Sequence, residues 1–213
     1  MGRIKQGILG GFNGKVGTVI GSSWKGITYM RSRAQHVKNP RTAGQIYSRN
    51  ALKAVTAALS PLASTLRITF KESAHNMSAF NKAVAVNYKA AIYEAGGEPH
   101  FNYEKLILSQ GSLRPFTYLV INDPSEDGNY YLSTIFDGNL YPEYDGLIFA
   151  IYDVTGGVWQ TGVIQQHFHV GDTLEFQGMP LLEAKEYIAY ACTYDPASGK
   201  VSDPIAEVET YGR

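Results

Sequence analysis

Lysine and arginine are the side chains of this sequence best placed to do chemistry with a partner, because they gather in its first third. Residues 1–71 contain twelve of them and no aspartate or glutamate, whereas residues 104–213 contain sixteen acidic and five basic side chains. Such cations neutralise phosphates or pair with carboxylates. The net charge of zero therefore conceals a basic half and an acidic half, and each predicts an electrostatic partner.

The candidate contact residues are the basic side chains near the N-terminus, with one tryptophan among them. Aromatic rings between cations can stack on bases, so the set suits a nucleic acid as well as the acidic face of another protein. No cofactor is expected at these positions. The candidates are Arg3, Lys5, Lys15, Trp24, Lys25, Arg31, Arg33, Arg41, Arg49 and Lys53.

Patterns associated with catalysis fail on spacing or on ligand number. Gly14-Lys15 lies in a glycine-rich stretch, but the first glycine of a phosphate-binding loop would fall at Leu9, and Val16 replaces the required hydroxyl residue. His167-Phe168-His169 offers two imidazoles on one side of a strand, with Asp172 behind them, and two ligands do not make a zinc site. The sequence therefore predicts a protein that is not an enzyme.

Cys192 is the only cysteine, so the fold cannot depend on an intrachain disulfide and a reducing compartment is expected. It lies in the apolar segment from Tyr187 to Tyr194, which predicts a small buried hydrophobe rather than a nucleophile. The N-terminal residues lack the apolar region of a signal peptide, and no apolar run approaches the roughly 18 residues of a membrane span. Neither secretion nor membrane insertion is expected.

The element that must position most of the cations is residues 1–38, predicted to form a glycine-rich β arm. Eight glycines separate β-favouring pieces, including Val16 to Ile20 and Ile27 to Met30, and Asn13-Gly14 is typical of a hairpin turn. Because glycine permits close approach of another backbone, we expect the arm to gain order by packing on something else. A glycine-rich hairpin on its own domain is the alternative.

Residues 39–100 are predicted to form a helical unit of about three helices. The first follows the start signal Asn39-Pro40-Arg41-Thr42 and runs to about Leu59, and the second spans roughly residues 61–71. The third starts at Asn76 or Ser78 and continues to Ala95, where Gly96-Gly97 ends it.

Two stripes are expected on the first helix. Arg41, Gln45, Arg49 and Lys53 recur every fourth residue and share one face. The apolar stripe on the other face consists of Leu52, Val55, Ala58 and Leu59.

Residues 101–213 change to the alternation typical of β-strands, with turn signals about a dozen residues apart. This pattern predicts an antiparallel sandwich of the wider immunoglobulin-like or fibronectin-like kind, without the cysteine pair of an antibody domain. The expected strands are 105–108, 118–122, 130–136, 147–152, 159–164, 173–176, 187–194 and 205–210.

Residues 39–93 resemble a helical motif of phage and prophage structural proteins. The resemblance rests on Asn39-Pro40-Arg41-Thr42 with Gln45 and Arg49, and on the later helix start Met77-Ser78-Ala79-Phe80-Asn81. With the glycine-rich arm before it (Gly14-Lys15-Val16-Gly17 and Trp24-Lys25-Gly26) and the sandwich after it, the layout is similar to an uncharacterised bacterial family of this length. The resemblance implies a virion or assembly role and no catalytic residue.

The expected fold class is α+β, with a basic β arm and a small helical unit followed by an acidic Ig-like sandwich. The expected function is that of a capsid- or tail-associated virion subunit, assembled in the bacterial cytoplasm. Its basic arm would contact other copies or other virion proteins. DNA or RNA binding by the N-terminal third is the first alternative, and a carbohydrate-binding or adhesive module is the second. No membrane partner is expected.

Overall fold

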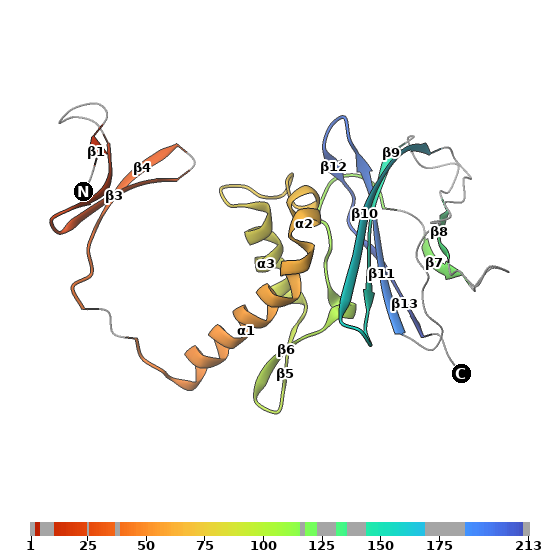
Figure 1. The fold of residues 1–213 in the computed structure, drawn as a ribbon, viewed down its shortest axis with the longest axis horizontal. Helices are drawn as coiled ribbons and strands as arrows, with labels where there is room; N and C mark the ends of the chain where they lie inside the picture. Colours follow the sequence, from red (N-terminus) through yellow and green to blue (C-terminus); the bar gives the residue numbers. More distant parts are fainter. Residues whose placement is uncertain are drawn as a thin grey trace. The chain divides into compact units, whose positions relative to one another are not determined.

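The chain divides into two compact units, Met1–Gln45 and Ile46–Arg213. The computed structural model describes residues 3–4, 11–24, 26–36, 39–115, 118–122, 131–135, 144–168 and 186–210. Its elements are a few helices and mostly antiparallel sheets (Figure 1). The fold is therefore α+β, with a β-sandwich-like C-terminal region, as predicted.

The first unit contains a four-stranded antiparallel sheet in the order β1-β2-β3-β4, here called the arm sheet. The predicted turn is wrong, because Asn13 and Gly14 lie inside β2 and the chain turns at Gly17, whose φ of 56° favours glycine. This turn also divides the predicted strand from Val16 to Ile20. The strands are β1 Arg3–Ile4, β2 Phe12–Val16, β3 Val19–Trp24 and β4 Ile27–Ser32.

Gly21 is the position where the arm sheet requires glycine. A Cβ atom on Gly21 would lie 2.0 Å from the carbonyl oxygen of Phe12 and 2.7 Å from Cδ2 of its ring. Phe12 therefore occupies the space of a side chain at position 21. Gly21 is the only buried residue in the described part of the first unit, so the described residues of this sheet form no hydrophobic core of their own.

The three predicted helices are present in the helical part of the chain. Of the two predicted starts of the third helix, Asn76 and Ser78, Ser78 caps α3, because its hydroxyl oxygen accepts the Asn81 N–H at 3.2 Å. None of the helices in the described ranges is long and apolar enough to cross a bilayer. The helical elements are α1 Ala43–Leu59, the 3-10 turn η2 Ser60–Leu62, α2 Ala63–Thr69 and α3 Ala79–Ala90.

The predicted extension of the third helix to Ala95 is wrong. Helix α3 ends at Ala90, and β5 (Ile92–Ala95) pairs antiparallel with β6 (Glu98–Phe101). The turn between them is Gly96-Gly97, with φ values of 62° and 81°. Positive φ at both central residues defines the tight hairpin turn that two glycines favour, so the glycines reverse a hairpin instead of ending a helix.

The C-terminal sheet has the order β10-β9-β11-β12, and β13 also pairs with β11. The prediction of a strand at 105–108 is wrong, because the 3-10 turn η3 (Tyr103–Lys105) and irregular chain occupy that segment. The predicted strand at 173–176 lies outside the described residues. The other predicted strands are confirmed as β7 Tyr118–Asn122, β8 Tyr131–Ile135, β9 Tyr144–Asp153, β10 Val158–Phe168, β11 Glu186–Asp195 and β13 Ile205–Thr210, with β12 Lys200–Val201 added.

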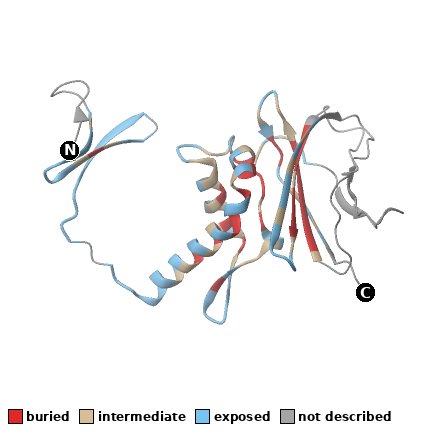
Figure 2. Cartoon of the chain, in the orientation of Figure 1, coloured by how far each residue is buried: buried red, intermediate tan, exposed pale blue. Residues whose placement is uncertain are grey.

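The helices and the C-terminal sheet share one hydrophobic core. Val55, Leu59 and Phe70 from the helical segment belong to the same buried cluster as Ile188 and Tyr190 of β11. Figure 2 shows the buried residues on the helices and along the central strands. The helices therefore bury apolar side chains against the sheet as well as against one another.

The second face of this sheet is covered as well. Leu147 and Ile151 on β9, and Ala189 and Ala191 on β11, alternate with the residues that face the helices and are buried too. Every residue from Tyr187 to Thr193 is buried. A strand buried on both faces reads as a continuous apolar run, which explains the composition of β11.

Asn87 attaches α3 to the chain that leads into the sheet. Its amide nitrogen donates to the carbonyl oxygen of Ile107 at 2.9 Å and to that of Ala83 at 3.0 Å, and its amide oxygen accepts the Ile107 N–H at 2.8 Å. Leu106 and Leu108, on either side of Ile107, are both buried in the shared core. Asn87 is itself fully buried, so it satisfies backbone groups that water does not reach.

We expect Asn87→Ala to lower the free energy of unfolding by about 2 to 4 kcal/mol, because it leaves the amide and carbonyl of Ile107 without partners and opens a cavity. Urea denaturation followed by circular dichroism measures the change. Asn81→Ala is the matched control, since Asn81 is exposed on the same helix and its loss is expected to stay within about 0.5 kcal/mol. Equal effects of the two substitutions would contradict the role of Asn87.

Candidate functional site

One face of the arm sheet combines cations with aromatic rings. Lys15 pairs with Ile20, and Ile20 pairs with Arg31, so these three side chains form a row across β2, β3 and β4. Because residues two apart share a face, Trp24 and Tyr29 lie on the same side. We call this the cationic face. It brings together three of the predicted contact residues.

The opposite face of the arm sheet is apolar. Val16 pairs with Val19 beside the first turn, and Met30 pairs with Gly21. Alternation places these residues on the side opposite Lys15 and Arg31. We call this the apolar face, and it carries no charged side chain among these paired positions.

Large apolar side chains are exposed on both faces. Met30 is 70% exposed on the apolar face and Ile27 is 67% exposed on the cationic face. The other exposed apolar residues of the sheet are Val16, Val19, Trp24 and Tyr29. A single sheet cannot bury both of its faces without further layers, and exposed apolar patches mark sites where another molecule binds.

The remaining arm candidates are spread along the chain. Arg33 follows β4, and its backbone N–H donates to the carbonyl oxygen of Thr18 at 2.7 Å. Arg3 lies in β1 and Arg41 precedes α1. Lys5 and Lys25 fall outside the described residues.

A second contact surface lies on α1. Arg49 and Lys53, one helical turn apart, line a hollow of about 490 Å³ together with Leu52. The prediction that Leu52 belongs to the buried stripe is wrong, because its side chain is 52% exposed, whereas Val55 and Leu59 are fully buried. Leu52 thus places an apolar side chain between two predicted cations.

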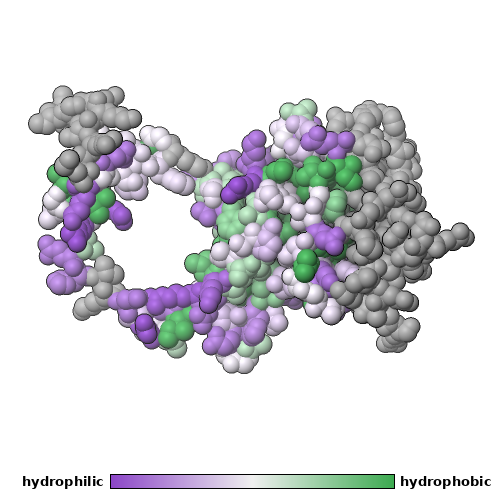
Figure 3. Space-filling model, in the orientation of Figure 1, coloured by the Kyte–Doolittle hydropathy of each residue, from purple (hydrophilic) through white to green (hydrophobic). Residues whose placement is uncertain are grey.

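Leu52 also borders a more apolar groove between α1 and α3. The groove has a volume of about 430 Å³, and Val84, Ala85 and Tyr88 of α3 line it, with Lys89 at its edge. On the face shown in Figure 3, hydrophilic surface runs along α1 and a paler, more apolar surface covers the neighbouring helices. Helical periodicity identifies the apolar residues of α1 and α3. It does not predict which of them the shared core leaves exposed in this groove.

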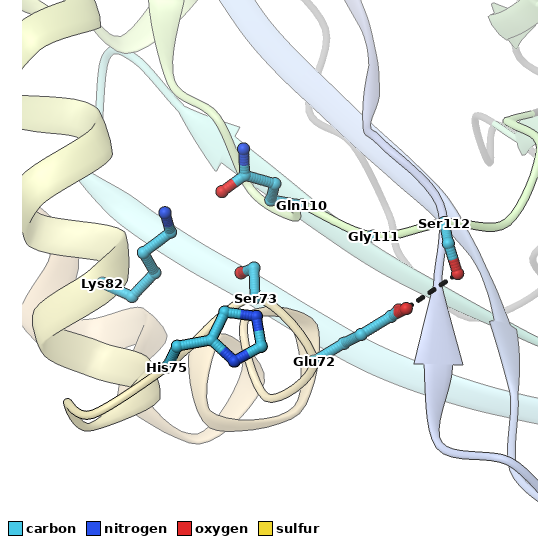
Figure 4. A pocket seen from close by; sticks show the side chains of 7 residues that line it. All are labelled: Glu72, Ser73, His75, Lys82, Gln110, Gly111 and Ser112. Atoms are coloured by element: carbon cyan, nitrogen blue, oxygen red, sulfur yellow. Dashed lines mark hydrogen bonds between the residues drawn. The ribbon is translucent and has the colours of Figure 1, made fainter.

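A polar pocket of about 380 Å³ lies beside α3 and the segment that follows η3. Glu72, Ser73, His75, Lys82 and Ser112 supply its ionisable and hydroxyl groups. The carboxylate of Glu72 points toward Ser112, whose hydroxyl donates to it at 2.8 Å (Figure 4). Sequence reasoning did not single out these residues, because they come from separate elements.

Both serine hydroxyl groups of this pocket donate to groups other than its histidine. Ser73 donates to the carbonyl oxygen of Phe70 at 3.4 Å, and Ser112 donates to Glu72. A serine nucleophile needs its hydroxyl hydrogen bonded to a general base. The pocket therefore offers a carboxylate, an imidazole and an ammonium group, but not the geometry of an activated serine.

Metal-ligand chemistry finds no support in the described ranges. No group of three or more His, Cys, Asp or Glu side chains able to hold a metal ion occurs there. In the predicted pair of imidazoles, His169 lies outside the described residues, as does Asp172. That pair stays a prediction.

Cys192 is completely buried in the C-terminal sheet. Burial raises the pKa of its thiol to about 12, and a hydrogen bond with Ser109 acts in the opposite direction. The thiolate is the nucleophilic form, so a thiol that stays protonated in a closed core is unreactive. The description of Cys192 as a small buried hydrophobe is confirmed.

Comparison with known protein families matches residues 11–128 to the "Family of unknown function (DUF6266)". The chain belongs to this family. The match begins one residue before β2 and runs through β7, so the family shares strands β2 to β4 of the arm and all three helices. No curated protein and no solved structure matches the chain.

We expect the native protein to leave a thiol reagent such as Ellman's reagent unreacted at pH 8, because burial keeps the Cys192 thiol protonated and out of contact with solvent. In guanidinium chloride one equivalent should react, since this is the only cysteine. Absorbance of the released thiolate measures both. Rapid reaction of the folded protein would contradict the burial of Cys192.

Proposed function

We propose that this protein is a non-enzymatic assembly subunit whose arm sheet binds a neighbouring copy. The observation that carries the proposal is the exposure of large apolar side chains on both faces of the arm sheet, including Met30 and Ile27. Covering such a side chain contributes about 1.5 to 3 kcal/mol when it becomes fully buried. A partner that covers both faces would stabilise a sheet whose described residues form no core of their own.

Charge favours another copy of the chain as that partner. The arm lies in a segment without acidic residues, and residues 104–213 of the same chain have eleven more acidic than basic side chains. Lys15 and Arg31 on the cationic face match such a surface. A contact between two different surfaces of identical subunits is heterologous, and it builds rings or open arrays.

The resemblance of residues 39–93 to phage structural proteins supports a virion as the setting of this assembly. In that setting the β-sandwich-like region, which we propose to be Ig-like, would contact other subunits or be displayed on the particle. The basic arm would order as it packs. The hollow lined by Arg49, Leu52 and Lys53 provides a second place for subunit contact.

We expect Tyr29→Ser and Met30→Ser, one on each face of the arm sheet, to weaken self-association by about 10- to 100-fold, because each removes apolar surface that the contact buries. Size-exclusion chromatography with light scattering over a concentration series gives the mean mass. High salt should also lower that mass, since the contact pairs opposite charges.

Tyr93→Ser is the matched control for Tyr29→Ser. Both tyrosines lie in hairpins, and they are 50% and 46% exposed. The control is expected to leave the mean mass unchanged. A wild-type protein that is strictly monomeric at high concentration and low salt would overturn the assembly proposal.

Nucleic-acid binding is the second candidate, and the cationic face is the observation that favours it. A sheet that carries Lys15 and Arg31 beside Trp24 and Tyr29 offers charges for phosphates and rings on which bases can stack. Phosphate contacts release counterions, so such binding weakens steeply as salt rises.

If nucleic acid binds this face, Lys15→Gln and Arg31→Gln should each reduce the slope of log affinity against log salt by about 1. Fluorescence anisotropy with labelled single-stranded DNA and RNA measures that slope. Lys200→Gln, an exposed lysine in the acidic half, should leave it unchanged. A wild-type affinity that does not vary with salt would exclude phosphate-led binding.

A further inference from the structure

Among the described residues, strand β10 forms an edge of the C-terminal sheet, and it lacks the charged residues and prolines that often protect an edge. Its eleven residues, Val158–Phe168, contain no Lys, Arg, Asp, Glu or Pro. In the described part of the chain β10 pairs with β9 alone. Unpaired N–H and C=O groups along a long uncharged edge are a template for pairing with another strand.

The opposite edge of the same sheet differs in charge. Strand β13 pairs with β11 and carries Glu207 and Glu209 in its six residues. Two copies of β13 would bring glutamates together, which opposes pairing of that edge with itself. The edge formed by β10 has no such repulsion.

Side-chain packing from within the same sheet and core fixes the position of strand β10. The Trp159 ring lies with its centroid 4.7 Å from that of Tyr152, and Trp159 packs against the shared core. A Cβ on Gly162 would lie 2.4 Å from the Phe149 ring, so this ring packs tightly on the strand. An edge that is already ordered loses little conformational entropy on binding.

We propose that β10 pairs with β10 of a second copy, antiparallel and about a two-fold axis, to join two C-terminal sheets into one. The register with β9 shifts between Gln165 and Phe168, and such an irregularity bends an edge away from a partner. The pairing segment is therefore 158–165. An isologous contact brings identical residues of two copies together. Because this segment has no charged residue, two copies of it can pair without electrostatic repulsion.

This contact is separate from the arm contact and does not depend on it. In the arm contact, the arm of one copy binds a different surface of another copy. In the β10 contact, the same strand of two copies pairs with itself. A subunit with one heterologous and one isologous contact can build an extended array of dimers.

The first test introduces a charge into the edge. Val163→Lys places two lysines near the two-fold axis, whereas Val208→Lys makes the same change on β13. The two valines are 41% and 42% exposed, so both variants should fold.

The measurement is sedimentation velocity on the full-length chain that carries Tyr29→Ser and Met30→Ser. These two substitutions weaken the arm contact, so the dimer that remains should be the one formed through β10. Val163→Lys should weaken that dimer at least tenfold and Val208→Lys should not.

The second test detects the pairing directly. Gln160→Cys, Thr161→Cys and Val163→Cys are made one at a time in the full-length chain, where native Cys192 is buried. Mild oxidation should give a disulfide-linked dimer for at least one of them, because Cα atoms near the axis approach within about 4.4 to 6.8 Å. Val208→Cys, on the other edge, should not cross-link.

The outcomes separate this proposal from the arm contact. Loss of all association in the arm variants, or equal effects of the two lysine substitutions, would overturn the β10 pairing and leave the arm contact standing. Failure of all three cysteines to cross-link would overturn it too, and would indicate a different strand on β10, such as β4 of another arm. Association that survives the arm variants and is lost with Val163→Lys supports it.

Discussion

Packing of the helices on one face of the β9 and β11 pair is the contact on which the second unit depends. Val55 and Leu66 come from the helical segment and Ile188 comes from β11, yet all three belong to one cluster. The helices and the sheet therefore bury apolar side chains against each other in a single core. Asn87 then fixes the segment between the layers, because its amide satisfies the backbone of Ile107 where water is excluded.

Element type was predictable wherever a short-range signal had a single reading. The strands β7, β11 and β13 follow from alternation. The start of α3 had two candidates, Asn76 and Ser78, and the hydrogen bond between Ser78 and Asn81 decides between them. The Gly96-Gly97 pair had two readings, because two glycines end a helix as readily as they reverse a hairpin, and pairing of Ile92 with Phe101 decided between them. Asn13-Gly14 likewise has turn chemistry, but pairing of Gly14 with Gly21 keeps it inside a strand.

The contact surfaces were predictable in charge but not in geometry. The absence of acids before Glu72 pointed to Lys15 and Arg31, but only strand register shows that they share one row. The exposure of Leu52 could not be foreseen, since the helical period gives one apolar stripe and not the fraction of it that a partner layer covers. Edge exposure on β10 likewise depends on strand order, which alternation does not encode.

The shared core has a consequence for biosynthesis. Val55 and Tyr190 pack in one cluster, although most of the chain lies between them, so the helical segment leaves the ribosome long before the strands that cover it are made. Contacts between such distant segments form late, and until then apolar surface is open to chance partners. Strand β11 is the last element of the shared core to be synthesised, so the core can form completely only after β11 has left the ribosome.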